Sequence, residues 1–275
     1  MVAVKPINSH FFALGLSALL VAGCNQTNQK NFEDLSVAEL KAVAAKGDSQ
    51  AQFALAFRYF HGRGVSKNPR EAMEWFRQAA ELGFPSAQTI LGEAYLKGFV
   101  VEKNQRAAVS WFQKAAAKGE PPAQLRLAIC YLNGTGTETN LTEGVVWLRR
   151  AAEKDLANAQ VELGRCYVFG RGTEQSFTKS AELFSKAANQ NYPEGQYWFA
   201  LQLISGHGVD KNLAEAWKWI ILAKGKDPVL RELVSEQMKH ERITPEQIVE
   251  GERLASEFAR TNQTAPFFVE GVHAL

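Results

Sequence analysis

The amino-acid sequence predicts an all-α protein, a superhelical solenoid of stacked helix pairs. Five segments of 36 residues align without a gap, over residues 47–82, 83–118, 119–154, 155–190 and 191–226. Within each segment, apolar and small residues recur at helical spacing in two stretches, and glycines separate the stretches. Because a single helix pair cannot bury its apolar face alone, five units in phase indicate a stack of neighbours.

The N-terminus is expected to be a signal segment rather than part of the fold. Residues 1–23 contain one lysine and an apolar stretch from Phe11 to Ala22, which is too short to span a bilayer as a helix. Residues 20–24, Leu-Val-Ala-Gly-Cys, resemble a bacterial lipobox, which implies cleavage before Cys24 and lipidation of its thiol. An ordinary secretory signal with a chance cysteine at its end is the alternative.

A polar tether is expected to follow Cys24. Residues 25–31 carry no apolar side chain, as is typical of a flexible linker, so residues 24–33 are assigned to this tether. Two or three acyl chains on Cys24 would anchor the protein to a membrane, where one chain would not. Asn25, rather than aspartate, follows the cysteine, which in enteric-type lipoproteins favours the outer membrane, facing the periplasm. The expected location is therefore the bacterial cell envelope.

A short helix over residues 34–46 should precede the repeats, because Ser36 and Glu39 form the pattern of a capping box. The first helix of each repeat then follows from columns of equivalent residues at a spacing of four, such as Ala51, Leu55 and Tyr59. A small residue beside this stripe lets a second helix approach closely, and it recurs as Ala56, Gly92, Ala128, Gly164 and Ala200.

The second helix of each repeat carries its own apolar face, with equivalent positions at Trp75, Trp111, Trp147, Leu183 and Trp219. In the first four repeats a pair of alanines follows one turn later. Between the two helices stands Gly62-x-Gly64, which recurs in three further repeats and departs once, as Gly98-x-Val100. Glycine accepts the left-handed conformation that follows a helix C-terminus, so these residues should end the first helices.

Two further helices with polar faces are expected after the repeats, within residues 227–260. The first covers residues 228–239. The second begins with Thr244 as the N-cap and Pro245 as the first helical residue. Residues 261–275 give no helical signal and are expected to form a tail.

The repeats resemble a known family. The segments Leu91-Gly-Glu-Ala-Tyr-Leu-Lys-Gly98 and Leu163-Gly-Arg-Cys-Tyr-Val-Phe-Gly-Arg-Gly172 are similar to the Sel-like (Sel-one-like) repeat, a relative of the tetratricopeptide repeat. The resemblance extends over about two thirds of the chain, from residue 47 to residue 226. It implies a non-catalytic interaction scaffold that binds a protein or peptide.

The resemblance to tetratricopeptide repeats also suggests where a partner binds. In that fold the first helices line a concave groove, and the positions two before and two after the repeated leucine face it. Carried over by column, these positions are Phe53, Thr89, Leu125, Val161 and Tyr197, then Phe57, Glu93, Ile129, Arg165 and Leu201. The aromatic residues and Arg165 would be the strongest anchors. The alternative is that several of these side chains pack between repeats, which helical spacing cannot distinguish.

Composition argues against several other functions. The chain has 31 basic and 29 acidic residues, a net charge of +2, so no nucleic-acid partner is expected. Five scattered histidines and three cysteines indicate no metal site, and no cofactor is expected. Cys130 and Cys166 stand 36 residues apart on equivalent helices, whose spacing of about 8–10 Å exceeds what a disulfide spans. Two buried thiols are favoured over a bridge.

The alternative function is a protein that binds, or weakly hydrolyses, β-lactam or peptidoglycan-like ligands, which requires an acyl-transfer enzyme to be considered. A cysteine-rich branch of the Sel-like family has been linked to penicillin binding and β-lactam hydrolysis, and Ser176-Phe-Thr-Lys179 matches the S-x-x-K pattern of such enzymes. The companion motifs are missing from the sequence, as are the paired cysteines of that branch. Ser176 stands at an expected helix start, where an N-cap is the favoured role.

Overall fold

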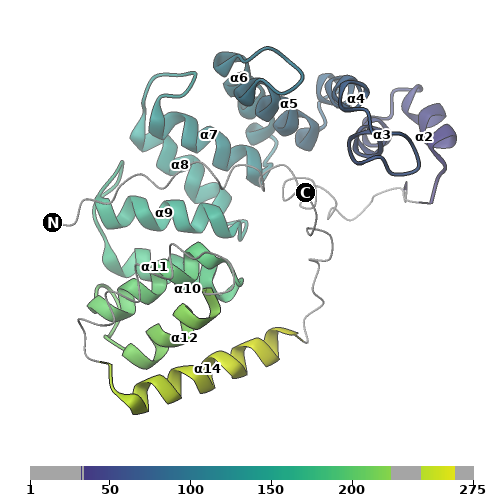
Figure 1. Ribbon diagram of the computed structural model, residues 1–275. Coiled ribbons are helices and arrows are strands. Elements are labelled where there is room, and N and C mark those ends of the chain that lie inside the picture. The colour runs from purple at the N-terminus through teal and green to yellow at the C-terminus, as the bar shows by residue number, and fades with distance from the viewer. Residues whose placement is uncertain (1–31, 33, 224–242, 264–275) are drawn as a thin grey trace. The chain divides into compact units, whose positions relative to one another are not determined.

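The computed structural model describes residues 32, 34–223 and 243–263, and every regular element in these residues is a helix. This confirms the predicted all-α solenoid (Figure 1). The chain divides into two compact units, Met1–Asn140 and Leu141–Leu275. The predicted signal segment, Cys24 and the predicted helix over residues 228–239 lie outside the described residues. Among the described helices, none is both long and apolar enough to cross a membrane.

The first unit consists of consecutive antiparallel helices (Figure 1). They are α2 (Val37–Ala44), α3 (Ser49–His61), α4 (Pro69–Glu81), α5 (Pro85–Lys97), α6 (Gln105–Ala117) and α7 (Pro121–Asn133). Each helix packs on the next, and α5 also contacts α7. The first helices of neighbouring repeats, α5 and α7, are therefore adjacent and share one face of the unit.

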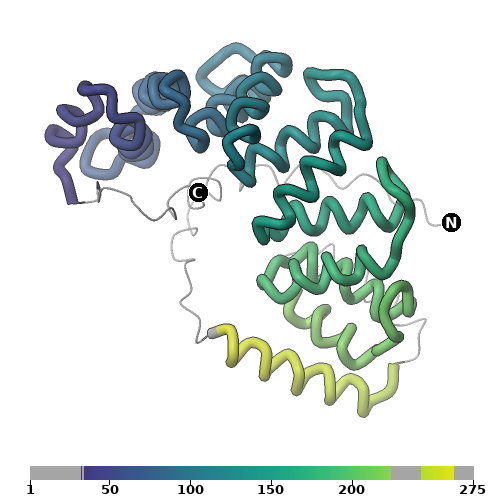
Figure 2. The backbone as a smooth tube through the Cα atoms, turned by 180° about the vertical axis from the view of Figure 1, so that it is seen from behind, coloured from purple at the N-terminus to yellow at the C-terminus, as the bar shows by residue number. Residues whose placement is uncertain are grey.

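The second unit repeats this arrangement (Figure 2). Its helices are α8 (Leu141–Ala152), α9 (Ala157–Phe169), α10 (Phe177–Asn189), α11 (Pro193–Ser205), α12 (Leu213–Ala223) and α14 (Pro245–Gln263). The first helices α9 and α11 contact each other, and α14 packs along α12.

The loop between the two helices of a repeat has one hydrogen-bonding pattern throughout. The first helix ends at a glycine with a left-handed backbone, for example Gly62 with φ 74°. The chain then turns back toward the second helix of the same repeat, and the N–H of Asn68, the residue just before α4, donates to the carbonyl of Tyr59. The Asn68 side chain then caps α4. Equivalent backbone bonds join Asn104 to Tyr95, Asn140 to Tyr131, Ser176 to Tyr167 and Asn212 to Leu203.

A buried glutamine joins each of the first four repeats to the helix before it, whereas Gln196 of the fifth repeat donates to the Asn191 side chain. The Gln88 Nε2 donates to the carbonyl of Ala80 at 3.0 Å, and the Gln52 Nε2 donates to that of Ala44 at 3.1 Å. These carbonyls lie at the C-terminal ends of the preceding helices, where no intrahelical donor is left. Each of these carbonyls also accepts a backbone N–H three residues further on, that of Gly83 for Ala80 and that of Gly47 for Ala44. The glutamine therefore adds a second hydrogen bond that ties the repeat to the end of the preceding helix. Longer contacts of the same kind join Gln124 to Ala116 and Gln160 to Ala152.

The small-residue column has the predicted role. Phe112 and Phe184 are fully buried, and a Cβ added to Gly92 or Gly164 would collide with the Phe112 or Phe184 ring. Helix α5 therefore approaches α6 closely at Gly92, and α9 approaches α10 closely at Gly164, as close packing of the core requires.

Both ends of the described chain carry the helix caps that the sequence indicates. Ser36 and Glu39 form a reciprocal capping box at the start of α2. At the start of α14, the Thr244 Oγ1 accepts from the Gln247 N–H, while the Gln247 side chain accepts from the Thr244 N–H. Helix α14 continues to Gln263, beyond the expected end at residue 260. Near this end, Thr261 donates its hydroxyl back to the Glu257 carbonyl.

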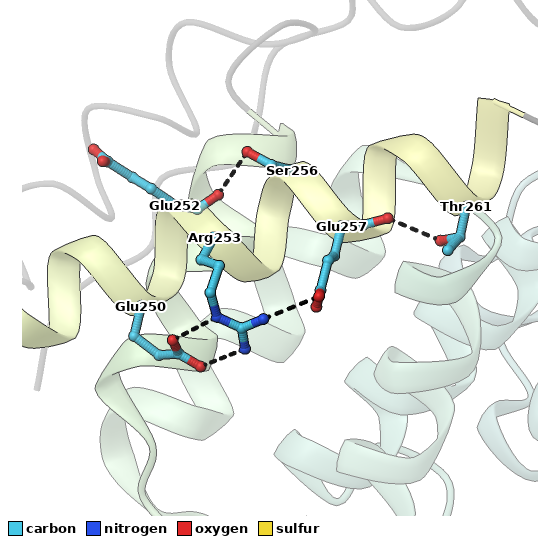
Figure 3. Close-up of polar contacts among 6 residues, drawn as sticks. All are labelled: Glu250, Glu252, Arg253, Ser256, Glu257 and Thr261. Atoms are coloured by element: carbon cyan, nitrogen blue, oxygen red, sulfur yellow. Dashed lines mark hydrogen bonds and ion pairs between the residues drawn. The ribbon is translucent and has the colours of Figure 1, made fainter.

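Helix α14 has an apolar inner face and a charged outer face. Gly251 lets it lie directly against Ala214 and Trp217 of α12, and Phe258 packs edge-on against Trp219 at 5.1 Å. On the outer face, the Arg253 guanidinium bridges Glu250 and Glu257 (Figure 3).

Candidate functional site: the face of the first helices

Four of the five residues two positions before the repeated leucine are buried: Phe53, Thr89, Leu125 and Val161. The Phe53 ring packs against Phe76 and Phe84, at centroid distances of 5.5 and 4.9 Å. Thr89 donates its hydroxyl to the Pro85 carbonyl within its own helix. These four side chains therefore pack between helices and do not face an open groove, which agrees with the alternative given for this column.

Tyr197 is the partly exposed member of that column. Its ring packs edge-on against Trp198 at 5.6 Å. Burial, with a smaller contribution from the Glu194 carboxylate, raises the pKa of the Tyr197 hydroxyl. The phenol is therefore neutral at physiological pH and can donate a hydrogen bond.

The residues two positions after the leucine are more accessible. Phe57, Ile129, Arg165 and Leu201 are partly exposed, whereas Glu93 is fully buried. The open face of the first helices is therefore formed mainly by this second column. The two columns differ in direction: Phe53 of the first column contacts the second helix α4, whereas Glu93 and Arg165 of the second column contact the neighbouring first helix.

Glu93 is the centre of an ion-pair cluster formed by Glu93, Lys97 and Arg126. One carboxylate oxygen of Glu93 lies 3.2 Å from the Lys97 Nζ, and the other lies 2.5 Å from the Arg126 Nε. The Glu93 side chain is 1% exposed, that of Arg126 16% and that of Lys97 27%. The carboxylate thus fixes two cations at the face while being hidden itself.

The aromatic side chains of α3 form a second cluster in the first unit. The Phe57 ring lies 4.3 Å from the His61 ring, and the Arg63 guanidinium lies 5.1 Å above Phe57. Desolvation, with smaller contributions from Arg63 and Lys67, lowers the pKa of His61. The imidazole is therefore neutral at pH 7, which suits its place against the aromatic rings.

The second unit carries a cluster that the sequence columns did not include in full, formed by Arg165, Phe169, Tyr197 and Trp198. The Trp198 ring lies edge-on to Phe169 at 6.3 Å, and the Arg165 guanidinium lies 6.0 Å from its centroid. Phe169 is 59% exposed, and Arg165 pairs with Glu162 at 3.0 Å. Tryptophan, tyrosine and arginine are the residues that contribute most to protein interfaces.

Trp198 and Arg126 occupy equivalent positions that the sequence analysis missed. Both lie one residue after the first column, and each contacts the second-column residue of the preceding repeat, Arg165 or Glu93. The contacts between α9 and α11 and between α5 and α7 bring these positions together. A helical-wheel comparison of neighbouring first helices could have identified this third column.

Ser176 and the two repeat cysteines occupy positions where they stabilise helix ends or the core. The Ser176 Oγ accepts from the Lys179 N–H and caps α10, as predicted. Cys130 and Cys166 are free and buried, and burial is the main cause that raises the pKa of each thiol to about 11. Within the described part of the chain, no three His, Cys, Asp or Glu side chains are grouped so that they could hold a metal ion.

Comparison with known proteins agrees with this architecture. The family model of the Sel1 repeat matches five consecutive segments at the same spacing, each beginning two residues later than the predicted segment. They are residues 49–84, 85–120, 121–156, 157–192 and 193–224. The crystal structure of a Sel1 repeat protein from Oxalobacter formigenes is 27% identical, with a TM-score of 0.68, and the match covers 89% of this chain and 98% of that one.

Two curated relatives match over shorter stretches. Chitin synthase regulatory factor 3 of Schizosaccharomyces pombe is 39% identical over 72 residues, which is 26% of this chain and 8% of the relative. Secretory immunoglobulin A-binding protein EsiB of Escherichia coli is 39% identical over 46 residues, which is 17% of this chain and 9% of the relative. The matched stretches span less than a tenth of either relative. Since the repeat model covers more than half of the chain, this protein belongs to the Sel1 repeat family.

Proposed function

We propose that this protein is a non-catalytic scaffold, tethered to the bacterial cell envelope, that binds a protein or peptide along the face of its first helices. Sel1 repeat proteins are generally protein-interaction scaffolds. The observation that carries the proposal is the composition of the accessible column, where Phe57 in one unit and Arg165 in the other stand beside further aromatic rings. Such side chains contribute binding energy when a partner excludes water from them.

The class of partner has further support from a relative. EsiB is named for binding secretory immunoglobulin A, a protein ligand, although the match covers only a small part of that protein. A protein or peptide is therefore the proposed partner of this chain as well. The β-lactam alternative gains no support from Ser176, whose hydroxyl oxygen is engaged in capping α10.

The proposed tether rests on the lipobox-like residues 20–24 and the polar stretch after Cys24. Asn25 favours the outer membrane, facing the periplasm. In cell fractionation with radiolabelled palmitate, the wild-type protein should carry label and sediment with outer-membrane vesicles. Cys24→Ala should lose both properties, and a variant that still sediments with the membrane would contradict the tether.

Affinity capture from cross-linked cells, read by mass spectrometry, tests the scaffold function. We expect a reproducible protein partner for the wild type, and loss of that partner for Phe57→Ala combined with Tyr197→Ala. Leu82→Ala is the matched control, because Leu82 is 56% exposed but follows the second helix α4. Retention of the partner by the double variant would contradict the proposed face. Enrichment of peptidoglycan fragments in place of a protein would favour the alternative function.

A further inference from the structure

The face of the first helices in the first unit has an uneven charge. On helices α5 and α7 this face carries two basic residues, Lys97 and Arg126, and one acidic residue, Glu93. The basic residue of α3, Arg58, instead donates to the carbonyl of Phe32. Glu93 is fully buried under its two cationic partners, so it contributes little to what a partner meets at the surface. In the second unit, α9 and α11 contain two acidic residues and one basic residue. The excess of positive charge is therefore a property of the first unit.

Acidic groups do occur at the edges of this face. Asp48 precedes α3 and accepts from the N–H groups of Gln50 and Ala51, and Glu120 precedes α7 and accepts from the Ser86 hydroxyl. Both lie at the N-terminal ends of their helices. Arg126 lies in the second turn of α7 and Lys97 at the last residue of α5, so the middle and C-terminal parts of the face hold the basic groups.

Arg126 is oriented for a further partner. Its Nε forms an ion pair with the Glu93 carboxylate, its side chain is 16% exposed, and no other described residue forms an ion pair or hydrogen bond with its two terminal nitrogens. A planar guanidinium with free terminal nitrogens matches the two oxygens of a carboxylate. Ile129 lies three residues further along the same helix, on the same side, and is partly exposed. The Arg126 guanidinium therefore lies on the same side of α7 as the apolar side chain of Ile129.

We propose that the first-helix face of the first unit binds an acidic peptide segment, with Arg126 pairing to a carboxylate of the peptide and Ile129 packing against a neighbouring apolar side chain. The charge complementarity of this face carries the assignment. Lys97 contributes to the attraction as a second, more exposed cation. This inference deepens the proposed scaffold function and rests on it.

Peptide selection with the purified full-length protein in detergent provides the test. Three pools of peptides about twelve residues long would combine Leu, Phe and Val with either Asp and Glu, Asn and Gln, or Lys and Arg. We expect the acidic pool to be enriched and its binding to weaken as salt rises. Arg126→Gln should weaken the best acidic peptide by at least about tenfold, because the bidentate carboxylate contact is lost. Arg106→Gln is the control, since Arg106 is exposed on the second helix α6.

The outcomes separate this inference from the function on which it rests. Enrichment of the neutral or basic pool, or unchanged binding by Arg126→Gln, would overturn the acidic-peptide assignment. So would the absence of binding by every pool. The cross-linking capture then decides independently whether the protein is a scaffold. Circular dichroism checks that Arg126→Gln folds, and Lys97→Gln, which keeps the Glu93–Arg126 pair, should weaken binding by a smaller factor.

Discussion

Replacing Glu93 with glutamine should destabilise the first unit strongly. The substitution keeps the size of the side chain but removes the charge between Lys97 and Arg126, leaving two partly buried cations facing each other. Breaking a buried ion pair costs about 3–5 kcal/mol. Because Lys97 and Arg126 remain 27% and 16% exposed, water can compensate part of this loss, and we expect about 2–4 kcal/mol.

Glu162→Gln is the matched comparison, because Glu162 pairs with Arg165 where the two side chains are 30% and 40% exposed. That pair should contribute less than about 1 kcal/mol. Urea unfolding followed by circular dichroism gives the two changes in unfolding free energy, and urea leaves the ionic strength constant. The larger cost of Glu93→Gln should also persist at high salt, since buried charges are poorly screened. Equal costs for the two variants would refute the reasoning.

Three further changes test the structure. Val100 has a φ of 61°, where the other repeats have glycine, so Val100→Gly should stabilise the protein by about 1 kcal/mol, and an unchanged or lower melting temperature would contradict this. Burial raises the pKa of the Cys130 and Cys166 thiols from 9 to about 11. These thiols therefore leave the unfolding free energy unchanged below pH 9 and lower it between pH 9 and 11, because there they ionise in the unfolded chain before they ionise in the folded one. Urea unfolding across this pH range should show a smaller decline when both cysteines are replaced with alanine. Ser176→Ala should cost about 1 kcal/mol through the lost N-cap, with partner capture unchanged, whereas loss of capture without loss of stability would give Ser176 a functional role.

The fold could be predicted because each repeat carries the same local signals. Gly62 and its equivalents end the first helices with a left-handed backbone, as predicted. Val100, which stands where the other repeats have the second glycine of the loop, such as Gly64, also has a left-handed backbone, which shows that stacking imposes the loop geometry even where the residue disfavours it. Comparing equivalent residues across the repeats therefore predicts the loop conformation better than one repeat does by itself.

The candidate site was harder to predict, because helical spacing does not say what lies opposite a side chain. Phe53 and Phe57 are one helical turn apart and both aromatic, yet Phe53 is buried against Phe76 whereas Phe57 is partly exposed. Arg126 and Trp198 acquire their surroundings from the preceding repeat, through contacts that depend on how neighbouring first helices stack. Such contacts between neighbouring repeats cannot be predicted from the spacing of residues within one helix.

The outer face of α14 has a consequence for how the protein behaves at its C-terminal end. A solenoid made of similar units has no inherent stopping point, since the apolar side of the last helix can accept another copy of the first. In this protein α14 covers Trp219, and the surface that it turns to solvent carries Arg253 between two glutamates. A chain cut after Ala223 would expose that apolar side while α2 still covers the first repeat, so it should pair with a second copy through the exposed C-terminal ends, a dimer that size-exclusion chromatography would detect.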